Sequence, residues 1–496
     1  MPLTMRLPSL DNRAPSLALA DTAATRLGKA IAPLAAANPG RSGIHALRDA
    51  RDAFAARVLL AQAAERSLDV QYYIWRKDLT GTLLFEALLA AAERGVRVRL
   101  LLDDNNTPGL DPTLAALDTH PNVEIRLFNP FPFRRARALG YATDFQRLNR
   151  RMHNKSFTAD NQATIVGGRN VGDEYFGATH GVLFADLDVI AVGPVVQEVS
   201  RAFDRYWASA SSYPVEGLLP AVSSSRIADL ASEARQIERS PEASAYVGAI
   251  HDLSVVRDLK QGTLELEWAA TRLVCDDPAK GLGHAAPESF VYRQLQEILG
   301  QPRSVLDLVS PYFVPTATGV EWFAQLARSG VDVQILTNAL EATDVAFVHA
   351  GYAKRRKPLL GEGIRLYELR RASSGASPPK TGSGGSSGAS LHAKTFSVDR
   401  ARVFVGSFNF DPRSAKLNTE MGLVIESPAL AQHIDDVFRV QVPADAYEVQ
   451  ALPDGRLSWQ ERRDGNSFRH ETEPGTTVWR RAAVSFLSAL PIEWLL

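Results

Sequence analysis

The sequence predicts an α/β protein built by tandem duplication of one unit of roughly 200 residues. The first observation is a repeat: His153 to Asn170, HNKSFTADNQATIVGGRN, recurs 239 residues later as HAKTFSVDRARVFVGSFN, His392 to Asn409. The second is that segments typical of strands and helices follow one another in the same order around both copies. Strands that alternate with helices predict parallel strand pairs with helices packed on the sheet.

The first half contains short runs rich in strand-forming residues, and between them longer stretches with apolar residues at helical spacing. In chain order we expect a helix over 43–65, a strand over 67–75, a helix over 80–93, a strand over 96–104, a short helix around 114 and a strand over 123–128. Gly95 ends the second of these helices, because glycine favours the conformation that terminates a helix. A strand, helix, strand order is the usual connection of two parallel strands.

The second half repeats this order. We expect a strand over 305–314, a helix over 318–330, a strand over 331–339 and a strand over 364–369. After the two motifs come matching strands over 186–194 and 420–428, each ending at a proline that begins a helix. Within the first motif, HNKSFTAD and QATIVGG are predicted strands joined by a turn at Asp160 and Asn161.

These patterns divide the chain into five segments. We expect a leader over 1–40, the first half with the first motif over 41–208, a helical bridge over 209–260, the second half with the second motif over 261–442, and a tail over 443–496. The leader has scattered arginines and no continuous apolar core, so we interpret it as loosely ordered or ordered on docking, and not as an export signal.

Two further segments have unusual composition. Residues 373–390, SSGASPPKTGSGGSSGAS, contain too few apolar residues to order themselves, which predicts a flexible insert next to His392. The tail contains a candidate amphipathic helix, VWRRAAVSFLSAL, over 478–490. Because this helix is short, we favour docking on the core over contact with a membrane surface.

Composition limits the class of protein. With 496 residues and 45% hydrophobic content, the chain can bury large cores. A net charge of -1 argues against a surface devoted to nucleic acid, although local basic patches remain compatible with it. No apolar run reaches about eighteen residues, so we expect no membrane-spanning helix. The single cysteine, Cys275, excludes an intramolecular disulfide and a multi-cysteine zinc site, and we expect a buried structural thiol.

The repeated motif carries the chemistry. A histidine two residues from a lysine on an extended strand projects to the same face as the lysine. Two such strands side by side would combine two imidazoles with two ammonium groups, amide donors and a hydroxyl, which suits a phosphodiester. The residues are His153, Lys155, Asn170, His392, Lys394, Ser407 and Asn409. The lysines would stabilise charge on the nonbridging oxygens, so we expect neither a metal nor a cofactor.

The two histidines suggest a covalent mechanism. One imidazole would attack phosphorus to form a phosphohistidine, and the other would protonate the leaving oxygen and then deprotonate the incoming hydroxyl. Asp186 and Glu420 occupy similar places in the repeat, and we expect them to orient His153 and His392, respectively. The motif aspartates, Asp160 and Asp399, have two open roles: direct chemistry, or capping the turn and orienting the lysine.

The two copies of HxKxxxxDxxxxxxG(G/S)xN resemble the paired motifs of the phospholipase D superfamily. The sequence around the motifs is similar to that of the bacterial cardiolipin synthase C type along much of the chain. The similar stretches are LDVQYYIW, GVRVRLLLDDNNTPGLD, FNPF, RLNRRMHNKSF, VGGRN, SPYFVPT, LTNALEATDV and VGSFNFDPRSAKLNTEMG. The resemblance implies two α/β/α units, each a mixed sheet flanked by helices, that together form one pseudo-twofold active site.

The resemblance also implies a phosphatidyltransferase that makes cardiolipin through a phosphohistidine, with phosphatidylethanolamine and phosphatidylglycerol as the expected substrates. It implies the catalytic residues His153, Lys155, Asp160, His392, Lys394 and Asp399, with His153 as nucleophile and His392 as acid and base. We expect a peripheral enzyme on an anionic membrane surface, at the cytoplasmic face of the bacterial inner membrane, with neither nucleic acid nor an obligate protein as partner. The alternative is a phosphodiesterase that hydrolyses phospholipid or nucleic acid, since water can resolve the same intermediate. A catalytically silent lipid-binding scaffold would need broken motifs, and both are intact.

Several other residues have both a structural and a functional interpretation, and for most of them we favour the structural one. The isolated histidines are expected to be structural: His120, His180, His251 and His349. The motif glycines should permit close backbone approach: Gly167, Gly168 and Gly406. Three nearby aromatic residues should pack: Phe128, Phe131 and Phe133. One basic stretch is either a solvated helix face or a surface for phospholipid headgroups: Arg134, Arg135, Arg137, Arg147, Arg150 and Arg151.

Overall fold

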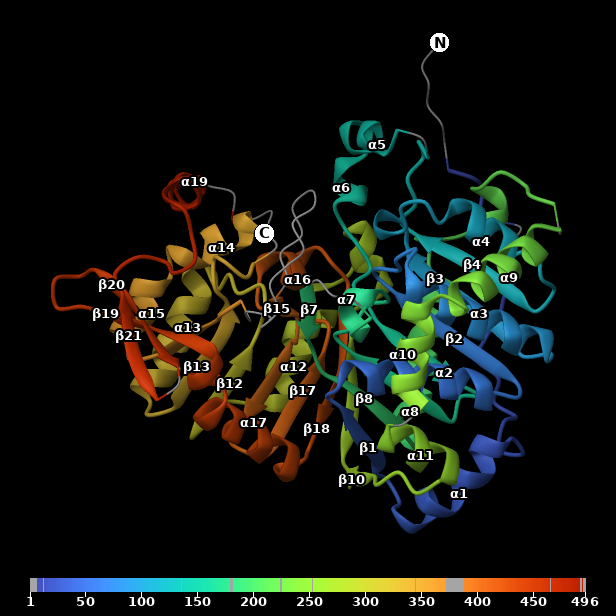
Figure 1. Cartoon of the computed structure of the whole chain (residues 1–496), viewed down its shortest axis with the longest axis horizontal. Coiled ribbons are helices and arrows are strands. Elements are labelled where there is room, and N and C mark those ends of the chain that lie inside the picture. Colours follow the sequence, from blue (N-terminus) through green and yellow to red (C-terminus); the bar gives the residue numbers. More distant parts are fainter. Residues whose placement is uncertain are drawn as a thin grey trace. The chain divides into compact units, whose positions relative to one another are not determined.

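The computed structural model describes residues 7–11, 13–134, 136–178, 182–223, 225–251, 253–343, 345–371, 388–463, 465–490 and 493. These residues form two compact units, which we describe separately (Figure 1). Unit 1 consists of the described parts of Met1–Ala178, Leu187–Val291 and Leu417–Leu423. Unit 2 consists of the described parts of Thr179–Asp186, Tyr292–Lys416 and Val424–Leu496. Each unit therefore includes a short segment that belongs, by sequence, to the other repeat.

The sheet of unit 1 has the strand order β10-β1-β8-β6-β5-β2-β3-β4-β9. Its strands are β1 (Ser42–Leu47), β2 (Ser67–Tyr72), β3 (Arg97–Asp103), β4 (Val123–Phe128), β5 (Ser156–Ala159), β6 (Ala163–Gly167), β8 (Asp188–Val192), β9 (Ser212–Pro214) and β10 (Glu267–Ala269). The predicted strands β2, β3 and β4 are parallel, and the other pairings are antiparallel. All residues of β2 are buried, and because side chains alternate between faces, both faces of the sheet must be covered there.

The helices of unit 1 pack around this sheet. They are α1 (Arg26–Ala37), α2 (Ala50–Ala63), α3 (Leu79–Glu93), α4 (Asp111–Leu117), α5 (Arg137–Thr143), α6 (Phe145–Leu148), α7 (Asp173–Phe176), α8 (Pro194–Trp207), α9 (Ser225–Glu238), α10 (Pro241–His251) and α11 (Ser254–Gln261). The carboxylates of Asp49 and Asp78 accept hydrogen bonds from backbone N–H groups in the first turns of α2 and α3, which explains where these helices begin. Helix α8 contacts the central strands and β11 (Thr271–Cys275).

The sheet of unit 2 continues from β18 in the order β18-β17-β16-β12-β13-β14-β19-β20-β21. Its strands are β12 (Val305–Val309), β13 (Asp332–Asn338), β14 (Arg365–Leu369), β16 (Thr395–Val398), β17 (Arg402–Gly406), β18 (Met421–Ile425), β19 (Ala446–Ala451), β20 (Leu457–Arg463) and β21 (Asn466–His470). Strands β12, β13 and β14 are parallel, as are β2, β3 and β4 in unit 1. The order from β18 to β14 matches the order from β8 to β4, so the predicted duplication of a mixed α/β unit is confirmed.

Unit 2 also contains a two-stranded parallel sheet of β7 (Val182–Ala185) and β15 (Gly388–Leu391). Its helices are α12 (Val291–Leu299), α13 (Thr316–Arg328), α14 (Ala346–Ala353), α15 (Arg356–Gly361), α16 (Pro412–Lys416), α17 (Pro428–Val440), α18 (Val442–Asp445) and α19 (Val478–Ala489). Helix α17 begins at a proline, as α8 does in unit 1, and both starts agree with the sequence prediction.

The N-terminal segment contains a helix and contacts the rest of unit 1. In the segment expected to be a loose leader, residues 26–37 form α1, and the Arg13 guanidinium donates to the carbonyls of Ser209 and Ser212. Most of the predicted flexible insert, 373–390, lies outside the described residues, and only 388–390 belong to β15. Among the helices that the structure describes, none combines the length and the apolar composition needed to cross a membrane.

Candidate active site

Each motif forms a β-hairpin closed by a tight turn. In unit 1, β5 and β6 are joined through Asp160 and Asn161, whose φ angles are 51° and 50°. In unit 2, β16 and β17 are joined through Asp399 and Arg400, with φ angles of 55° and 51°. Two successive residues with positive φ are typical of the turn type that matches the twist of a hairpin. The turn predicted at Asp160 and Asn161 is therefore confirmed.

The motif aspartates hold these turns in place. Asp160 Oδ1 accepts hydrogen bonds from the backbone N–H groups of Arg66 and Ser67, at 2.8 and 2.9 Å, where β2 begins. Asp399 Oδ1 accepts a hydrogen bond from the backbone N–H of Ser304, at 2.7 Å, where β12 begins. Burial raises the pKa of Asp399, but these backbone hydrogen bonds outweigh burial and lower it below its usual value. These contacts agree with the turn-capping role, which is one of the two roles that the sequence left open for both residues.

Replacing Asp160 or Asp399 by alanine is therefore expected to lower stability. Each change leaves backbone N–H groups without their acceptor, which should cost about 2–4 kcal/mol at the buried Asp160. The cost should be smaller at Asp399, because its donors Arg303 and Ser304 are exposed and water can replace the carboxylate. Thermal unfolding of the variants measures the loss, and Asp160→Asn and Asp399→Asn, which keep one acceptor oxygen, should recover part of it. An unchanged melting temperature together with abolished activity would contradict the structural role.

The histidine and lysine of each motif lie just before the hairpin. His153 and Lys155 precede β5, and His392 and Lys394 precede β16, so the prediction that they lie on the strand is wrong. The reason is that the backbone N–H of each histidine bonds elsewhere: His153 to the carbonyl of Thr419 and His392 to that of Ala185, both at 2.9 Å. Each lysine Nζ donates to the carbonyl oxygen of the histidine two residues before it. The two sites are thus built alike.

A carboxylate holds each imidazole, and the pairing is the reverse of the prediction. His153 Nδ1 lies 2.8 Å from Glu420 Oε2, and His392 Nδ1 lies 2.6 Å from Asp186 Oδ2. The cause is the exchange of segments described above, because Leu417–Leu423 is part of unit 1 and Thr179–Asp186 is part of unit 2. Asp186 and Glu420 were identified because they occupy equal positions in the two repeats. A single sequence, however, contains no signal that the segments carrying them are exchanged between the units.

This pairing selects the reactive nitrogen. A carboxylate accepts a hydrogen bond, so Nδ1 of each ring carries the proton and Nε2 is the nitrogen available for chemistry. Both histidines are buried except for a small exposed fraction, 6% for His153 and 7% for His392. Each site therefore combines an oriented imidazole with a neighbouring ammonium group in surroundings that contain little water, where electrostatic interactions are strong.

Two residues near His153 were not predicted from the sequence: Tyr73, which contacts the ring, and Asp276, which contacts its partner Glu420. The ring of Tyr73 meets the His153 ring edge-on with centroids 4.8 Å apart, and Lys155 Nζ lies 5.5 Å from the centre of the same ring. Tyr73 follows the parallel strand β2, and its position at the carboxyl end of the strand was a usable signal. Asp276 Oδ2 accepts from the backbone N–H of Glu420 at 2.8 Å. Burial raises the pKa of Asp276 to about 6, against the opposing effect of Lys280.

The predicted phosphate-binding residues are buried in their own units. Asn170 Oδ1 accepts from the backbone N–H of Ile74 at 3.2 Å, and its Nδ2 has no hydrogen-bond partner in the described part of the chain. A buried donor in this state is suited to an anion that enters the site. Asn409 has its Oδ1 unsatisfied, and exchange of the amide oxygen and nitrogen would present a donor there as well. Ser407 is fully buried.

Several residues of the arginine-rich stretch are paired with carboxylates. The guanidinium of Arg134 pairs with Asp104 and Asp111, and that of Arg151 is buried against Asp103. Arg147 pairs with Asp144. Carboxylates of unit 1 thus pair with three of these arginines, whereas the guanidinium of Arg150 donates to the carbonyl of Lys280. Arg135 lies outside the described residues.

Several further residues were predicted to have structural roles. Phe128 and Phe131 are fully buried, which confirms packing as their role. A Cβ added to Gly167 would lie 2.1 Å from Asp188 Oδ1, which confirms the close approach at this glycine. Cys275 is buried, and burial raises the pKa of its thiol to about 12, as expected of a structural cysteine. His349 is buried beside Glu473 at 3.1 Å, whereas His180 lies outside the described residues.

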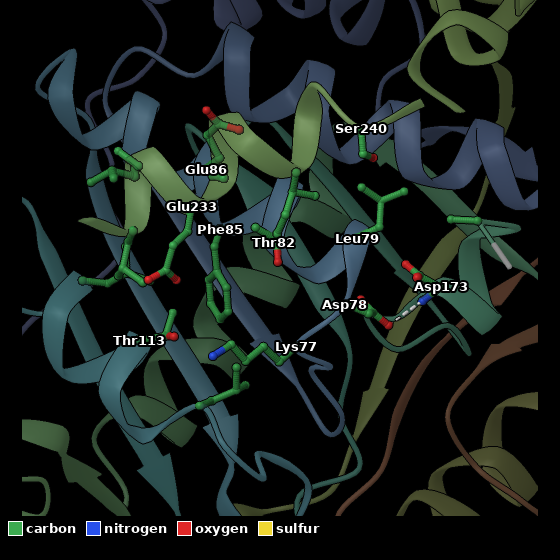
Figure 2. A pocket seen from close by; sticks show the side chains of 18 of the residues that line it. Lys77, Asp78, Leu79, Thr82, Phe85, Glu86, Thr113, Asp173, Glu233 and Ser240 are labelled. Carbon is green, nitrogen blue, oxygen red and sulfur yellow. Dashed lines mark hydrogen bonds between the residues drawn. The ribbon is translucent and has the colours of Figure 1, made fainter. Parts of the chain in front are cut away.

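A pocket of about 450 Å³ in unit 1 lies apart from the motifs (Figure 2). Figure 2 shows Phe85 and Thr82 of α3, Thr113 of α4 and Glu233 of α9 facing it. No histidine, lysine or asparagine of either motif lines this pocket. The pocket is therefore separate from the two histidine sites.

Chelators are expected to leave the activity unchanged, because in the predicted mechanism imidazoles and lysines would supply the acid, the nucleophile and the positive charge. Among the described residues, no group of three or more His, Cys, Asp or Glu side chains is arranged to hold a metal ion. Activity before and after incubation with EDTA tests this expectation. Inactivation that added metal reverses would contradict it.

Comparison with known proteins agrees with this geometry. The family model described as "Cardiolipin synthase, PLD-like domain" matches residues 58–207 and 295–441, which include both motifs and more than half of the chain. The chain belongs to the phospholipase D superfamily. This phospholipase D-like protein is 52% identical to the Escherichia coli protein named cardiolipin synthase C, over 95% of this chain and 100% of that one. It is 30% identical to an uncharacterized protein of Helicobacter pylori, over 95% of this chain and 93% of the relative.

A solved structure shows the same fold. The phosphatidylserine synthase of Haemophilus influenzae superimposes with a TM-score of 0.56 at 14% identity, covering 86% of this phospholipase D-like chain and 92% of the other. The family, the duplication and the mixed α/β units predicted from the sequence are therefore confirmed.

Proposed function

We propose that this protein synthesises cardiolipin by transferring a phosphatidyl group from one phospholipid to another, with phosphatidylethanolamine and phosphatidylglycerol as the expected pair. The observation that carries the proposal is that both sites contain an oriented histidine, a lysine and a carboxylate, so two imidazoles are available for two chemical roles. The 52% identity to a protein named cardiolipin synthase C, covered along its whole length, supports the choice of reaction.

In the proposed first step, His153 Nε2 attacks the phosphorus of the donor lipid. The bond from phosphorus to the headgroup oxygen breaks, and His392, which begins this step as the imidazolium, gives its Nε2 proton to that oxygen. The phosphatidyl group is then attached to His153 as a phosphohistidine. Lys155 and Lys394 stabilise the negative charge that develops on the nonbridging oxygens, and Glu420 stabilises the positive charge on the His153 ring.

In the second step, the hydroxyl of the acceptor lipid gives its proton to His392 and attacks phosphorus. The bond between phosphorus and His153 breaks, which releases the product and restores both histidines. That both histidines serve one cycle is supported by the duplication, because each motif supplies one oriented imidazole and one lysine.

The proposal includes the surroundings of the enzyme. The substrates are phospholipids, and the enzyme is associated peripherally with an anionic membrane surface, which we place at the cytoplasmic face of the inner membrane. His153 is assigned as the nucleophile, and Tyr73 and Glu420, which both contact its ring, would hold it in position for attack.

The test is incubation of the purified protein with vesicles that contain labelled phosphatidylethanolamine and phosphatidylglycerol. Cardiolipin that carries both labels, together with released ethanolamine, is the expected result, and His153→Ala serves as the inactive control. Formation of phosphatidic acid without cardiolipin would show that water is the acceptor and would contradict the proposed transfer.

A further inference from the structure

Helix α19 has two apolar faces, and one of them is covered. Val484 is only 4% exposed, and together with Leu487 it packs against a small apolar cluster of unit 2. That cluster consists of Leu340 and the α14 residues Ala346, Ala350 and Ala353. Figure 1 shows α19 beside α14 in unit 2. The predicted docking of this helix on the core is therefore present.

Another face of α19 exposes large apolar side chains. Trp479 is 85% exposed and Phe486 is 68% exposed, and because they are seven residues apart they lie on one face of the helix. Val478, at the start of the helix, is 69% exposed. Single exposed apolar residues are common, but an exposed tryptophan and phenylalanine aligned on one short helix indicate an interaction surface. We call Val478, Trp479 and Phe486 the α19 surface.

The charges of α19 define what this surface would contact. The helix contains Arg480 and Arg481 and no acidic residue. Arg480 donates to the carbonyl of Thr343, and Arg481 donates to that of Thr476. Because carbonyl groups are neutral, these contacts leave the positive charge of both arginines in place. A helix with exposed aromatic residues and uncompensated arginines is complementary to the surface of a bilayer that contains anionic phospholipid.

Helix α19 is connected to the segment that leads to His392. The chain after β13 contacts α19 through Leu340 and Thr343. The same segment accepts a hydrogen bond at Ala342 O from Ser390 Oγ, two residues before His392. Asn338, at the end of β13, bonds both backbone groups of Leu391. A short chain of contacts within unit 2 thus connects α19 to the segment that leads into the histidine site.

We propose that the α19 surface docks unit 2 on the interfacial region of a bilayer that contains anionic phospholipid. The inference rests on the proposed function for the nature of the substrate, and it identifies the surface that meets the membrane. A second copy of the chain is a poorer occupant. Three side chains on one helix cover much less than the roughly 800 Å² per partner of a stable protein interface.

The test compares full-length variants in sedimentation with vesicles of phosphatidylglycerol or of phosphatidylcholine. The double variant Trp479→Ser with Phe486→Ser should bind phosphatidylglycerol vesicles at least about tenfold more weakly than the parent, about 1.4 kcal/mol. Phe468→Ser is the matched control, because Phe468 is an exposed aromatic residue on β21, outside the α19 surface, and its binding should equal that of the parent. Arg480→Gln with Arg481→Gln should reduce the release of the protein by salt.

Equal binding by the double variant and the parent would overturn the proposal. So would a change in the oligomeric state of the double variant in analytical ultracentrifugation with no change in vesicle binding, since that result would assign the surface to a second copy. Thermal unfolding of each variant confirms that the exposed substitutions leave the fold intact. Vesicle binding does not require turnover, so a protein that makes no cardiolipin would still test this inference.

Discussion

Replacing His153 or His392 by alanine is expected to reduce phosphatidyl transfer by at least about 10⁴-fold, because nucleophile and acid act as one unit. The double variant should be no worse than the poorer single variant, since losses within such a unit do not add. Initial rates of cardiolipin formation measure both effects. Two single losses that multiply in the double variant would show that the histidines act independently.

Alanine at position 153 also leaves the buried carboxylate of Glu420 without its partner, which can lower stability. The matched control is His153→Asn, and likewise His392→Asn, because an amide nitrogen can still donate to the carboxylate. The asparagine variants should unfold at nearly the temperature of the parent and be as inactive as the alanine variants. An asparagine variant that retains activity within about tenfold of the parent would contradict the two-histidine mechanism.

The second large effect is expected from the exchanged carboxylates. Glu420→Gln and Asp186→Asn should each lower the rate by about 10²–10⁴-fold while the histidines remain in place. The reason is that an amide can donate to Nδ1, which favours the tautomer with a proton on Nε2, the atom that must react. An amide also fails to stabilise the imidazolium form. Rates at several pH values, with thermal unfolding as control, distinguish this effect from loss of folded protein.

The pairing itself can be read from the imidazole nitrogens. In ¹⁵N NMR spectra of histidine-labelled protein, Glu420→Gln should shift the Nδ1 resonance of His153, and Asp186→Asn that of His392. Each variant is the matched control for the other, and the asparagine variants at the two histidines provide the assignments. A shift of His392 in the Glu420→Gln protein would contradict the pairing described above.

The duplicated motifs were predictable because their information is local. The order of strands and helices, the turn at Asp160 and Asn161, and the identity of the two histidines follow from residue type and spacing within short windows. Proline at the start of α8 and α17 similarly marks both helices directly. These features need no knowledge of the path of the chain beyond one repeat.

The carboxylate pairing could not be predicted because it depends on that path. His153 and Glu420 are 267 residues apart, and His392 and Asp186 are 206 apart, so no local pattern connects them. The contacts of the arginines before the first motif could not be predicted for a related reason. Arg134 and Arg151 find carboxylates in the β3–α4 region, and their neutralisation is invisible in a basic stretch considered alone. Tyr73 was missed because an aromatic residue after a buried strand is usually part of the core.

The most direct test of the account is to locate the covalent intermediate. Each histidine variant is mixed with a labelled p-nitrophenyl phosphodiester, whose leaving group needs no proton, and is then quenched and digested for mass spectrometry. The account predicts label on His153 in the His392→Ala protein and no label in the His153→Ala protein. Label on His392 in the His153→Ala protein would contradict the assigned roles, and a hydrolysing protein with no label on either histidine would contradict the covalent mechanism.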